Sequence, residues 1–545
     1  MDTRGLTRLA GIGATLLVAL LGAHSAPALG CPPAARPRGL TTCSSDVDLR
    51  ALMAQDPDAR RLRREIDSIF TATVAEAARP TADPAGQVTL LGKMLLYDKT
   101  LSVDRNMACV ECHDPRTGFT GGIESINRTV VAYVNSTGQF VSPRKPQSIA
   151  YAAFSPRLHY NRTQKDFYGG NFWDMRATGV RLANPAAEQA QGPPTNPLEM
   201  ALADPACVVY LMSRRPYRAL FEKVWGAQSF GIAWPANVEK VCSTPGPPPA
   251  NDPFPVHLDP KSRGIASSTY DAMALAIASY EASPEVSPFS SKFDSALAHP
   301  TQQVLTADEQ AGWELFRGKA RCNACHLDGT QAGPAARPIA AAARPTTDAV
   351  QPAPPTGTPV RGAVSPADAA NVAPLFTDFT SANLGVPRNP ALRFYCENKP
   401  NAAGFTPNPD GAAFVDHGVA GFLRSKQNPD REWARLADGF DGAFQVPTLR
   451  NVDMRPRPGF VRPYAHNGYF KSLKEIVHFY NTRDVLPRCR GENDPGEKVR
   501  CWPAPEVGVN VDSTVGKLGL TDHEEDQLVA FLRTLTDVLP PGARR

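Results

Sequence analysis

The stretch "MACVECHDPRTGF" (107–119) separates Cys109 from Cys112 by two residues and places His113 directly after the second cysteine. The stretch "RCNACH" (321–326) repeats this pattern with Cys322, Cys325 and His326. C-x-x-C-H is the attachment motif of c-type haem, because two thioether bonds hold the porphyrin while the histidine binds its iron. A zinc site would need four ligands, and neither motif has a second C-x-x-C or H-x-x-H nearby. The sequence therefore predicts two covalently bound haems c.

Helical patterns accompany both motifs. Before the second motif, Thr306 and Glu309 have the spacing of a capping box, and before the first, Leu91 and Leu95 lie one helical turn apart. The stretch 520–537 begins with another such box and carries an apolar stripe. Helix, haem motif, loops and a closing helix make up the cytochrome c plan. We therefore expect a mainly α fold with two cytochrome c-like haem domains packed together, at 60–300 and 301–545, and long proline-rich loop insertions at 243–262 and 331–370.

The N-terminus has the features of an export signal. Arg4 and Arg8 precede an apolar run and a small-residue cleavage pattern, which predicts a signal peptide over 1–28 and an N-terminal extension over 29–59. A lipoprotein box ending at Cys31 is the alternative. No other stretch is long enough to cross a bilayer, so we expect a periplasmic protein without a transmembrane segment. The formal net charge of +4 is too small to indicate a nucleic-acid partner.

The chain has eleven cysteines, of which four belong to the haem motifs. In an exported chain the others are candidates for disulfides. Their local spacing predicts the pairs Cys31–Cys43, Cys207–Cys242 and Cys489–Cys501, and it leaves Cys396 unpaired.

Several segments together are more distinctive than C-x-x-C-H alone. They are "LGKMLLYDKTLS" (91–102), "NFWDMRA" (171–177), "EQAQGPPTNPLEM" (188–200), "FQVPTLRNV" (444–452) and "RPYAHNGYFKSLKEIVHFYN" (462–481). In this order the chain resembles the bacterial di-haem cytochrome c peroxidase family and its MauG branch over about 85–535. The resemblance implies a periplasmic enzyme in which one haem meets hydrogen peroxide and the other exchanges electrons with a partner protein.

The resemblance makes His113 the proximal ligand of the N-terminal haem. In classical members a second histidine closes the distal side until the enzyme is reduced. Here no histidine lies between His113 and His159, which favours the MauG-like arrangement with an open haem. His159 stays open as a mobile ligand or a loop histidine.

Three residues in the matching segments are implied to be catalytic. Glu199 fits the distal acid/base and Gln189 its partner, while Pro193 shapes the same pocket; an exposed glutamate in a turn is the alternative for Glu199. Trp173 fits a tryptophan between the haems that relays electrons, or else a core aromatic. Met175 departs from the glycine that is common in the family.

For the C-terminal haem, His326 is the implied proximal ligand, and the sixth ligand separates the branches. Where the peroxidase branch has methionine, this chain has Tyr480, whose oxygen would stabilise ferric and higher oxidation states. His478 is the competing ligand, and Tyr480 as a packing residue is a further alternative. Met454 lies upstream of His466 and does not match.

Calcium commonly bridges the domains in this family, held by an asparagine side chain and backbone carbonyls. Pro463 and the Val461 carbonyl are available, but Lys145 stands where the asparagine is expected, so a calcium ion is doubtful.

Three functions fit these residues. The first is a MauG-like oxidase that uses hydrogen peroxide to oxidise a protein substrate. The second is a conventional peroxidase that takes electrons from a small cytochrome or cupredoxin. The third is a non-catalytic electron carrier, which would need neither Glu199 nor Gln189.

Overall fold

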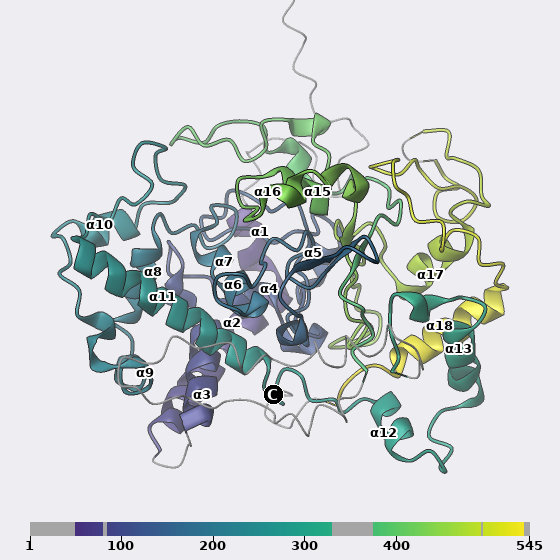
Figure 1. The fold of residues 1–545 in the computed structure, drawn as a ribbon, viewed down its shortest axis with the longest axis horizontal. Coiled ribbons are helices and arrows are strands. Elements are labelled where there is room, and N and C mark those ends of the chain that lie inside the picture. The colour runs from purple at the N-terminus through teal and green to yellow at the C-terminus, as the bar shows by residue number, and fades with distance from the viewer. Residues whose placement is uncertain (1–48, 80–83, 330–373, 492–493, 539–545) are drawn as a thin grey trace, which may run out of the picture.

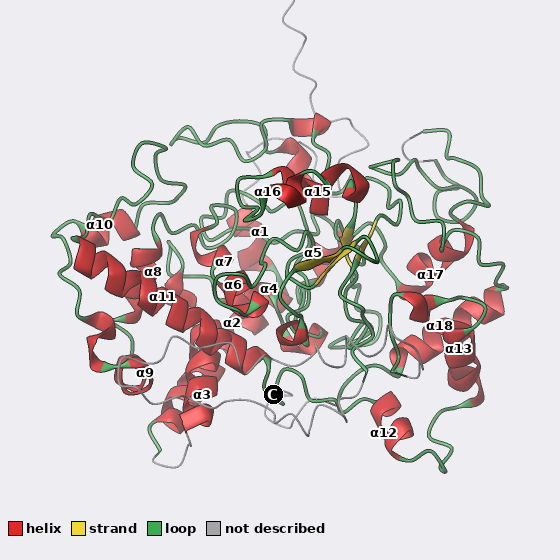
Figure 2. Cartoon of the chain, viewed as in Figure 1, coloured by secondary structure: helices red, strands yellow, loops and turns green. Residues whose placement is uncertain are grey.

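The computed structural model describes residues 49–79, 84–329, 374–491 and 494–538 (Figure 1). Helices dominate, with a few very short strands and long irregular connections (Figure 2), so the expected mainly α fold is confirmed. The predicted signal peptide and the whole of the predicted 331–370 loop, together with Cys31 and Cys43, lie outside the described residues.

The helices of the N-terminal half are α1 (Leu49–Gln55), α2 (Pro57–Ala77), α3 (Pro84–Leu96), α4 (Cys109–Cys112), α5 (Glu124–Arg128), α6 (Pro185–Ala190), α7 (Gly192–Thr195), α8 (Pro205–Met212), α9 (Arg218–Trp225), α10 (Val238–Cys242) and α11 (Pro260–Glu281). Those that follow are α12 (Lys292–Ala298), α13 (Ala307–Arg317), α15 (Val419–Arg424), α16 (Arg431–Ala434), α17 (Leu473–Thr482) and α18 (Asp522–Arg533). Two antiparallel pairs are formed by β1 (His159–Asn161) with β2 (Asp166–Tyr168), and by β3 (Ser381–Ala382) with β4 (Phe444–Gln445).

Each half contains a close helix crossing built on a glycine. In the first, α3 crosses α11, and a Cβ added to Gly92 would lie 1.9 Å from the Ala276 carbonyl oxygen. In the second, α13 crosses α18, and a Cβ added to Gly312 would lie 2.0 Å from the Gln527 carbonyl oxygen. Both distances are too short for any side chain, so glycine is required at each crossing. Each crossing joins the helix before a haem motif to a later helix of the same half.

The predicted capping boxes of the second crossing are confirmed. At the start of α13, the Glu309 N–H donates to Thr306 Oγ1 (3.3 Å) and the Thr306 N–H donates to Glu309 Oε2 (2.7 Å). Thr521 and Glu524 make the same pair of bonds at the start of α18. These boxes satisfy backbone donors that the first helical turn leaves free, and so they fix where both helices begin.

Two large apolar cores divide the chain. The first contains residues from Leu62 to Val286 together with Leu375 and Phe379, and the second contains residues from Phe293 to Leu535. Apart from Leu375 and Phe379, the core changes between 286 and 293, somewhat before the expected boundary at 300. Two smaller clusters mix the halves, because residues 392–395 pack with the segment 123–141, and residues 419–443 pack with the segment 158–175. Figure 1 shows α15 and α16 lying over the N-terminal half.

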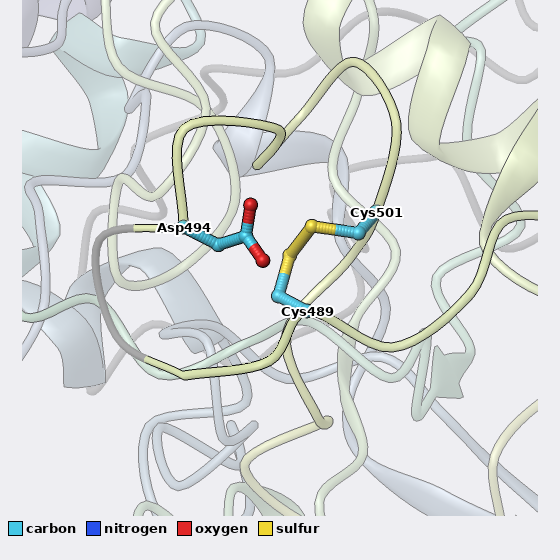
Figure 3. Close-up of side chains that lie close together, drawn as sticks. All are labelled: Cys489, Asp494 and Cys501. Carbon is cyan, nitrogen blue, oxygen red and sulfur yellow. A yellow bond between two sulfur atoms is a disulfide. The ribbon is translucent and has the colours of Figure 1, made fainter.

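The two predicted disulfides Cys207–Cys242 and Cys489–Cys501 are both present. The first joins α8 to α10, and the second closes a loop that follows α17. Asp494 lies beside the second pair (Figure 3), but its carboxylate accepts the backbone N–H groups of Gly496 and Arg490, which makes it a turn residue rather than a metal ligand. The expectation that Cys396 is unpaired is wrong, because this cysteine is disulfide-bonded. Local spacing could not reveal the pairing, since Cys396 has no neighbouring cysteine in sequence.

No helix among the described residues is long and apolar enough to span a membrane.

Candidate active site

A cavity lies beside the first haem motif. Cys109 and Cys112 line it as free thiols, together with His113. The residues that the resemblance implied for this haem line the same cavity: Trp173, Gln189, Pro193 and Glu199. His113 is the one histidine in the lining that the structure describes. His159 is exposed on β1, where its ring stacks on Tyr168, and does not line this cavity.

The two motif histidines are oriented in the same way. His113 Nδ1 lies 3.1 Å from the Phe119 carbonyl oxygen, and His326 Nδ1 lies 2.9 Å from the Phe376 carbonyl oxygen. Burial lowers the pKa of both imidazoles to about 4, so each ring is neutral and donates from Nδ1. This leaves the Nε2 lone pair free for a metal. Both acceptor phenylalanines have a left-handed backbone, with φ of 58° and 53°, which shows that one local design is used twice.

Glu199 is held by the turn "TNPLEM" (195–200). Its Oε1 accepts the Asn196 amide (2.9 Å), and its backbone carbonyl accepts the Ser136 N–H (2.7 Å). Burial raises the pKa of Glu199 although Arg176 opposes the shift, so the carboxyl keeps a proton to higher pH than a free glutamate does. Gln189 comes from α6, whose start is capped by Asn184. Both side chains line the N-terminal cavity.

Trp173 lines both haem-motif cavities. Its indole Nε1–H donates to the Lys145 carbonyl oxygen (3.1 Å), and its own carbonyl accepts the Gln445 N–H (2.8 Å), so segments from both halves hold it. The turn around it is tight, because Phe172 and Met175 have φ of 69° and 62°. Glycine adopts such a φ most easily, so the backbone at Met175 is strained for a residue with a side chain.

The second cavity is lined by Cys322, Cys325 and His326. On α17 the residues Leu473, Ile476, Val477 and Tyr480 share one helical face and line this cavity. His478 lies on another face, and its Nδ1 is 3.0 Å from Glu525 Oε1 on α18. No methionine occurs in the described lining, and Met454 is buried elsewhere. Of the two competing side chains, only Tyr480 faces the cavity.

Several lining residues were not found by sequence reasoning as site residues. Arg176 and Glu281 line the N-terminal cavity, and burial raises the pKa of Glu281 to about 8. Arg462 and His466 line the C-terminal cavity, and Lys145 lines both. These residues come from segments far apart in the chain, so no local spacing signals their convergence. Of these residues, the sequence singles out only Lys145, which stands where the resemblance implies an asparagine.

The residues expected to hold calcium do not fit that ion. The Lys145 ammonium is buried and contacts the Pro146 carbonyl oxygen (3.1 Å) and Thr120 Oγ1 (3.4 Å). The Val461 carbonyl accepts the Asn127 side-chain amide (3.1 Å). A charged lysine cannot ligate calcium, so the side chain at the position of the expected asparagine does not fit the ion.

Two haem-attachment motifs, each with free thiols beside a large cavity and a tryptophan that lines both, define a di-haem c-type protein. The family model of the di-haem cytochrome c peroxidases matches residues 87–302. The chain is 30% identical to the methylamine utilization protein MauG of Paracoccus denitrificans over 472 residues, which cover 86% of this chain and 92% of that protein. It therefore belongs to the di-haem cytochrome c peroxidase and MauG family, and it is a di-haem oxidoreductase of the peroxidase type.

Other relatives agree with this assignment. A cytochrome-c peroxidase of Denitromonas iodatirespirans, IdrP1, is 24% identical over 456 residues, which cover 83% of this chain and 81% of that protein. The diheme peroxidase BthA from Burkholderia thailandensis has the same fold, with a TM-score of 0.55, 24% identity, and coverage of 85% of this chain and 92% of that one.

Proposed function

We propose that this protein is a MauG-like enzyme that reacts with hydrogen peroxide at the N-terminal haem and exchanges electrons with a partner protein through the C-terminal haem. The observation that supports this proposal most is the N-terminal cavity, where Glu199 and Gln189 share the lining with His113 and the described lining offers no second histidine. An open iron site with an acid beside it suits peroxide and has no use in a plain electron carrier.

Each haem, when bound, supplies the redox-active iron. In our proposal His113 and His326 bind the two irons through Nε2, since Nδ1 of each ring is occupied by a carbonyl. The haems would supply the two electrons that cleave the O–O bond, and Glu199 would be placed to move a proton from one peroxide oxygen to the other, so that the second leaves as water. The Asn196 amide fixes Oε1 for this transfer, and the Gln189 amide helps to orient the peroxide.

Trp173 and Tyr480 carry the second part of the proposal. Trp173 lines both cavities and is our candidate for the electron relay between the haems. Tyr480 is our candidate for the second axial ligand at the C-terminal haem, where an anionic oxygen favours the oxidised metal. Because His478 lies 3.0 Å from Glu525, it would have to leave a carboxylate partner to reach the cavity. A tyrosine ligand, which favours oxidised iron, fits an enzyme that oxidises a side chain of a partner protein better than a conventional peroxidase that takes electrons from a small donor protein.

We further propose that residues 1–28 direct export to the periplasm, and that 60–300 and 301–545 are the two haem domains. The two large apolar cores support the division, although Leu375 and Phe379 belong to the N-terminal core and residues 392–443 contribute to clusters with the N-terminal half.

Glu199→Gln tests the proposed chemistry. The variant keeps the size and the Asn196 contact but cannot transfer the proton, so the reaction with peroxide should slow by about 10²–10⁴-fold in stopped-flow spectra. Mass spectrometry should still find two attached haems. Glu432→Gln, at an exposed glutamate, is the matched control and should react like the wild type. A loss of less than about threefold in Glu199→Gln would exclude Glu199 as the acid.

The conventional peroxidase is the second candidate, supported by the name of the IdrP1 relative. It predicts rapid steady-state turnover of peroxide with a reduced small cytochrome or cupredoxin as the electron donor. The MauG-like enzyme should instead turn over slowly with such donors and oxidise a side chain of a partner protein.

A further inference from the structure

Lys145 occupies an unusual position between the two halves of the molecule. Its side chain lines both haem-motif cavities, and only 8% of the residue is exposed. Its backbone N–H donates to the His466 carbonyl oxygen (2.9 Å), while its carbonyl accepts the Trp173 indole N–H (3.1 Å). The ammonium lies 5.5 Å from the centre of the Trp173 ring. These contacts hold the Lys145 ammonium beside Trp173, which lines both cavities.

The Lys145 charge has no carboxylate partner among the described residues. Its Nζ contacts two neutral oxygens, those of Pro146 and Thr120. Burying an ammonium without an opposite charge is costly, and burial together with the nearby Arg462 lowers the pKa of Lys145 to about 7. The neighbouring Arg144 differs, because it is paired with two carboxylates, Asp174 and Asp416. An anion is therefore missing next to Lys145 but not next to Arg144.

Two further polar groups of the C-terminal cavity, on Arg462 and His466, form no ion pair with a carboxylate among the described residues. The Arg462 guanidinium is buried and donates to the backbone oxygens of Thr117 (2.8 Å) and Asn451 (2.6 Å), which are neutral. His466 is only 4% exposed, and its Nε2 has no hydrogen-bond partner within the described part of the chain. Two buried cationic side chains and an unpartnered imidazole nitrogen thus line one cavity, whose own carboxylates have other partners: Asp416 pairs with Arg144, Glu506 accepts the Tyr395 hydroxyl and Asp512 accepts the Thr514 N–H. Haem brings carboxylates of its own, the propionates, and these are the anions that the cavity must accommodate.

We propose that Lys145 is the resident counter-ion of the haem carboxylates, facing both cavities and assisted in the C-terminal one by Arg462 and His466. In this role it supplies, from the protein itself, the positive charge that a metal ion would otherwise bring between the two haems. The misfit of Lys145 as a calcium ligand agrees with this role, because its ammonium fills the position where the family has an asparagine oxygen. The inference rests on the proposed placement of the haems in the two cavities.

The proposal has a consequence that does not depend on peroxide. A fixed positive charge near an iron stabilises the reduced form relative to the oxidised form, because reduction adds an electron. Lys145→Gln removes the charge with little change in length, so the reduction potentials of both haems should fall. Lys145→Arg keeps the charge and should leave both potentials near the wild-type values. Lys426→Met, at an exposed lysine, is the control and should change neither.

The experiment is spectroelectrochemical titration of the purified holoprotein, after mass spectrometry has shown two attached haems. In parallel, the metal content of the wild type is measured and its optical spectrum is recorded with and without the chelator EGTA. We expect no stoichiometric calcium, and no spectral change with the chelator. Since neither readout uses peroxide, a failure here is distinguishable from a failure of the proposed enzyme activity.

Three results would overturn the proposal. The first is unchanged potentials in Lys145→Gln. The second is an equal shift in Lys145→Gln and Lys145→Arg, which would mean that packing and not charge matters. The third is one calcium per chain whose removal alters the haem spectrum. If Lys145→Gln does not retain both haems, the wild-type calcium measurement and the potentials of Lys145→Arg still decide.

Discussion

Gly312→Ala should destabilise the protein strongly, because it adds a carbon at the crossing of α13 and α18. The new Cβ would lie 2.0 Å from the Gln527 carbonyl oxygen, 2.6 Å from its carbon and 2.9 Å from Phe531 Cβ, where ordinary contacts begin at 3.4 Å. Two of these atoms belong to the backbone and cannot rotate away, so the helices must separate along the crossing. Overpacking a core typically costs about 1–3 kcal/mol, and we expect the upper end of this range or more.

The matched control is Gly264→Ala in α11. Gly264 is also helical and exposed, but a Cβ there would meet no atom within 4 Å. Alanine should therefore stabilise the helix by about 0.5–1 kcal/mol through its higher helix propensity. The assay is urea denaturation of the holoprotein, followed by helical circular dichroism and by the haem absorption band. If Gly312→Ala unfolds at the wild-type midpoint, the close crossing does not exist as described.

Two further predictions concern the site and the contact between the halves. Tyr480→Phe should remove the ligand of the C-terminal haem and so change its low-spin signal in the ferric spectrum, whereas His478→Ala should leave that signal in place; the opposite pattern would assign the ligand to His478. Arg144 makes ion pairs with Asp416 (2.6 Å) and Asp174 (2.7 Å) and holds the pKa of the Asp416 carboxyl far below its usual range. This contribution to the free energy of unfolding is complete above about pH 4, the unfolded pKa, and is lost as the pH falls toward the lower folded pKa. Asp416→Asn should therefore lower stability at pH 7 by about 3–5 kcal/mol and flatten the acid dependence measured by denaturant midpoints; an unchanged acid slope would contradict the assignment.

Local patterns in the sequence predicted the features that depend on neighbouring residues. The C-x-x-C-H motifs, the capping boxes at Thr306 and Thr521 and the disulfide between Cys489 and Cys501 all have short spacings, and the structure contains each of them. Which of Tyr480 and His478 lines the C-terminal cavity could also have been predicted from the helical period, since Tyr480 continues the apolar face of α17 and His478 does not.

Features that depend on distant segments could not be predicted in this way. Cys396 is disulfide-bonded, but it has no cysteine nearby in the sequence that would indicate this. The convergence of Lys145, Trp173 and Arg462 at the C-terminal cavity joins segments from both halves, and nothing in their spacing encodes it. The sequence also gives no sign that residues 419–443 pack on the segment 158–175. This packing crosses the domain boundary that the repeated helix and haem-motif plan places near residue 300.

The most direct test of the central claim is the electron paramagnetic resonance spectrum of the ferric wild-type holoprotein, recorded as isolated and without prior reduction. An open N-terminal haem beside Glu199 and a closed C-terminal haem bound by Tyr480 should give one high-spin and one low-spin signal, and the high-spin signal should be lost when hydrogen peroxide is added. Two low-spin signals that persist in the presence of peroxide would contradict the account, because they would mean that a second side chain closes the N-terminal haem.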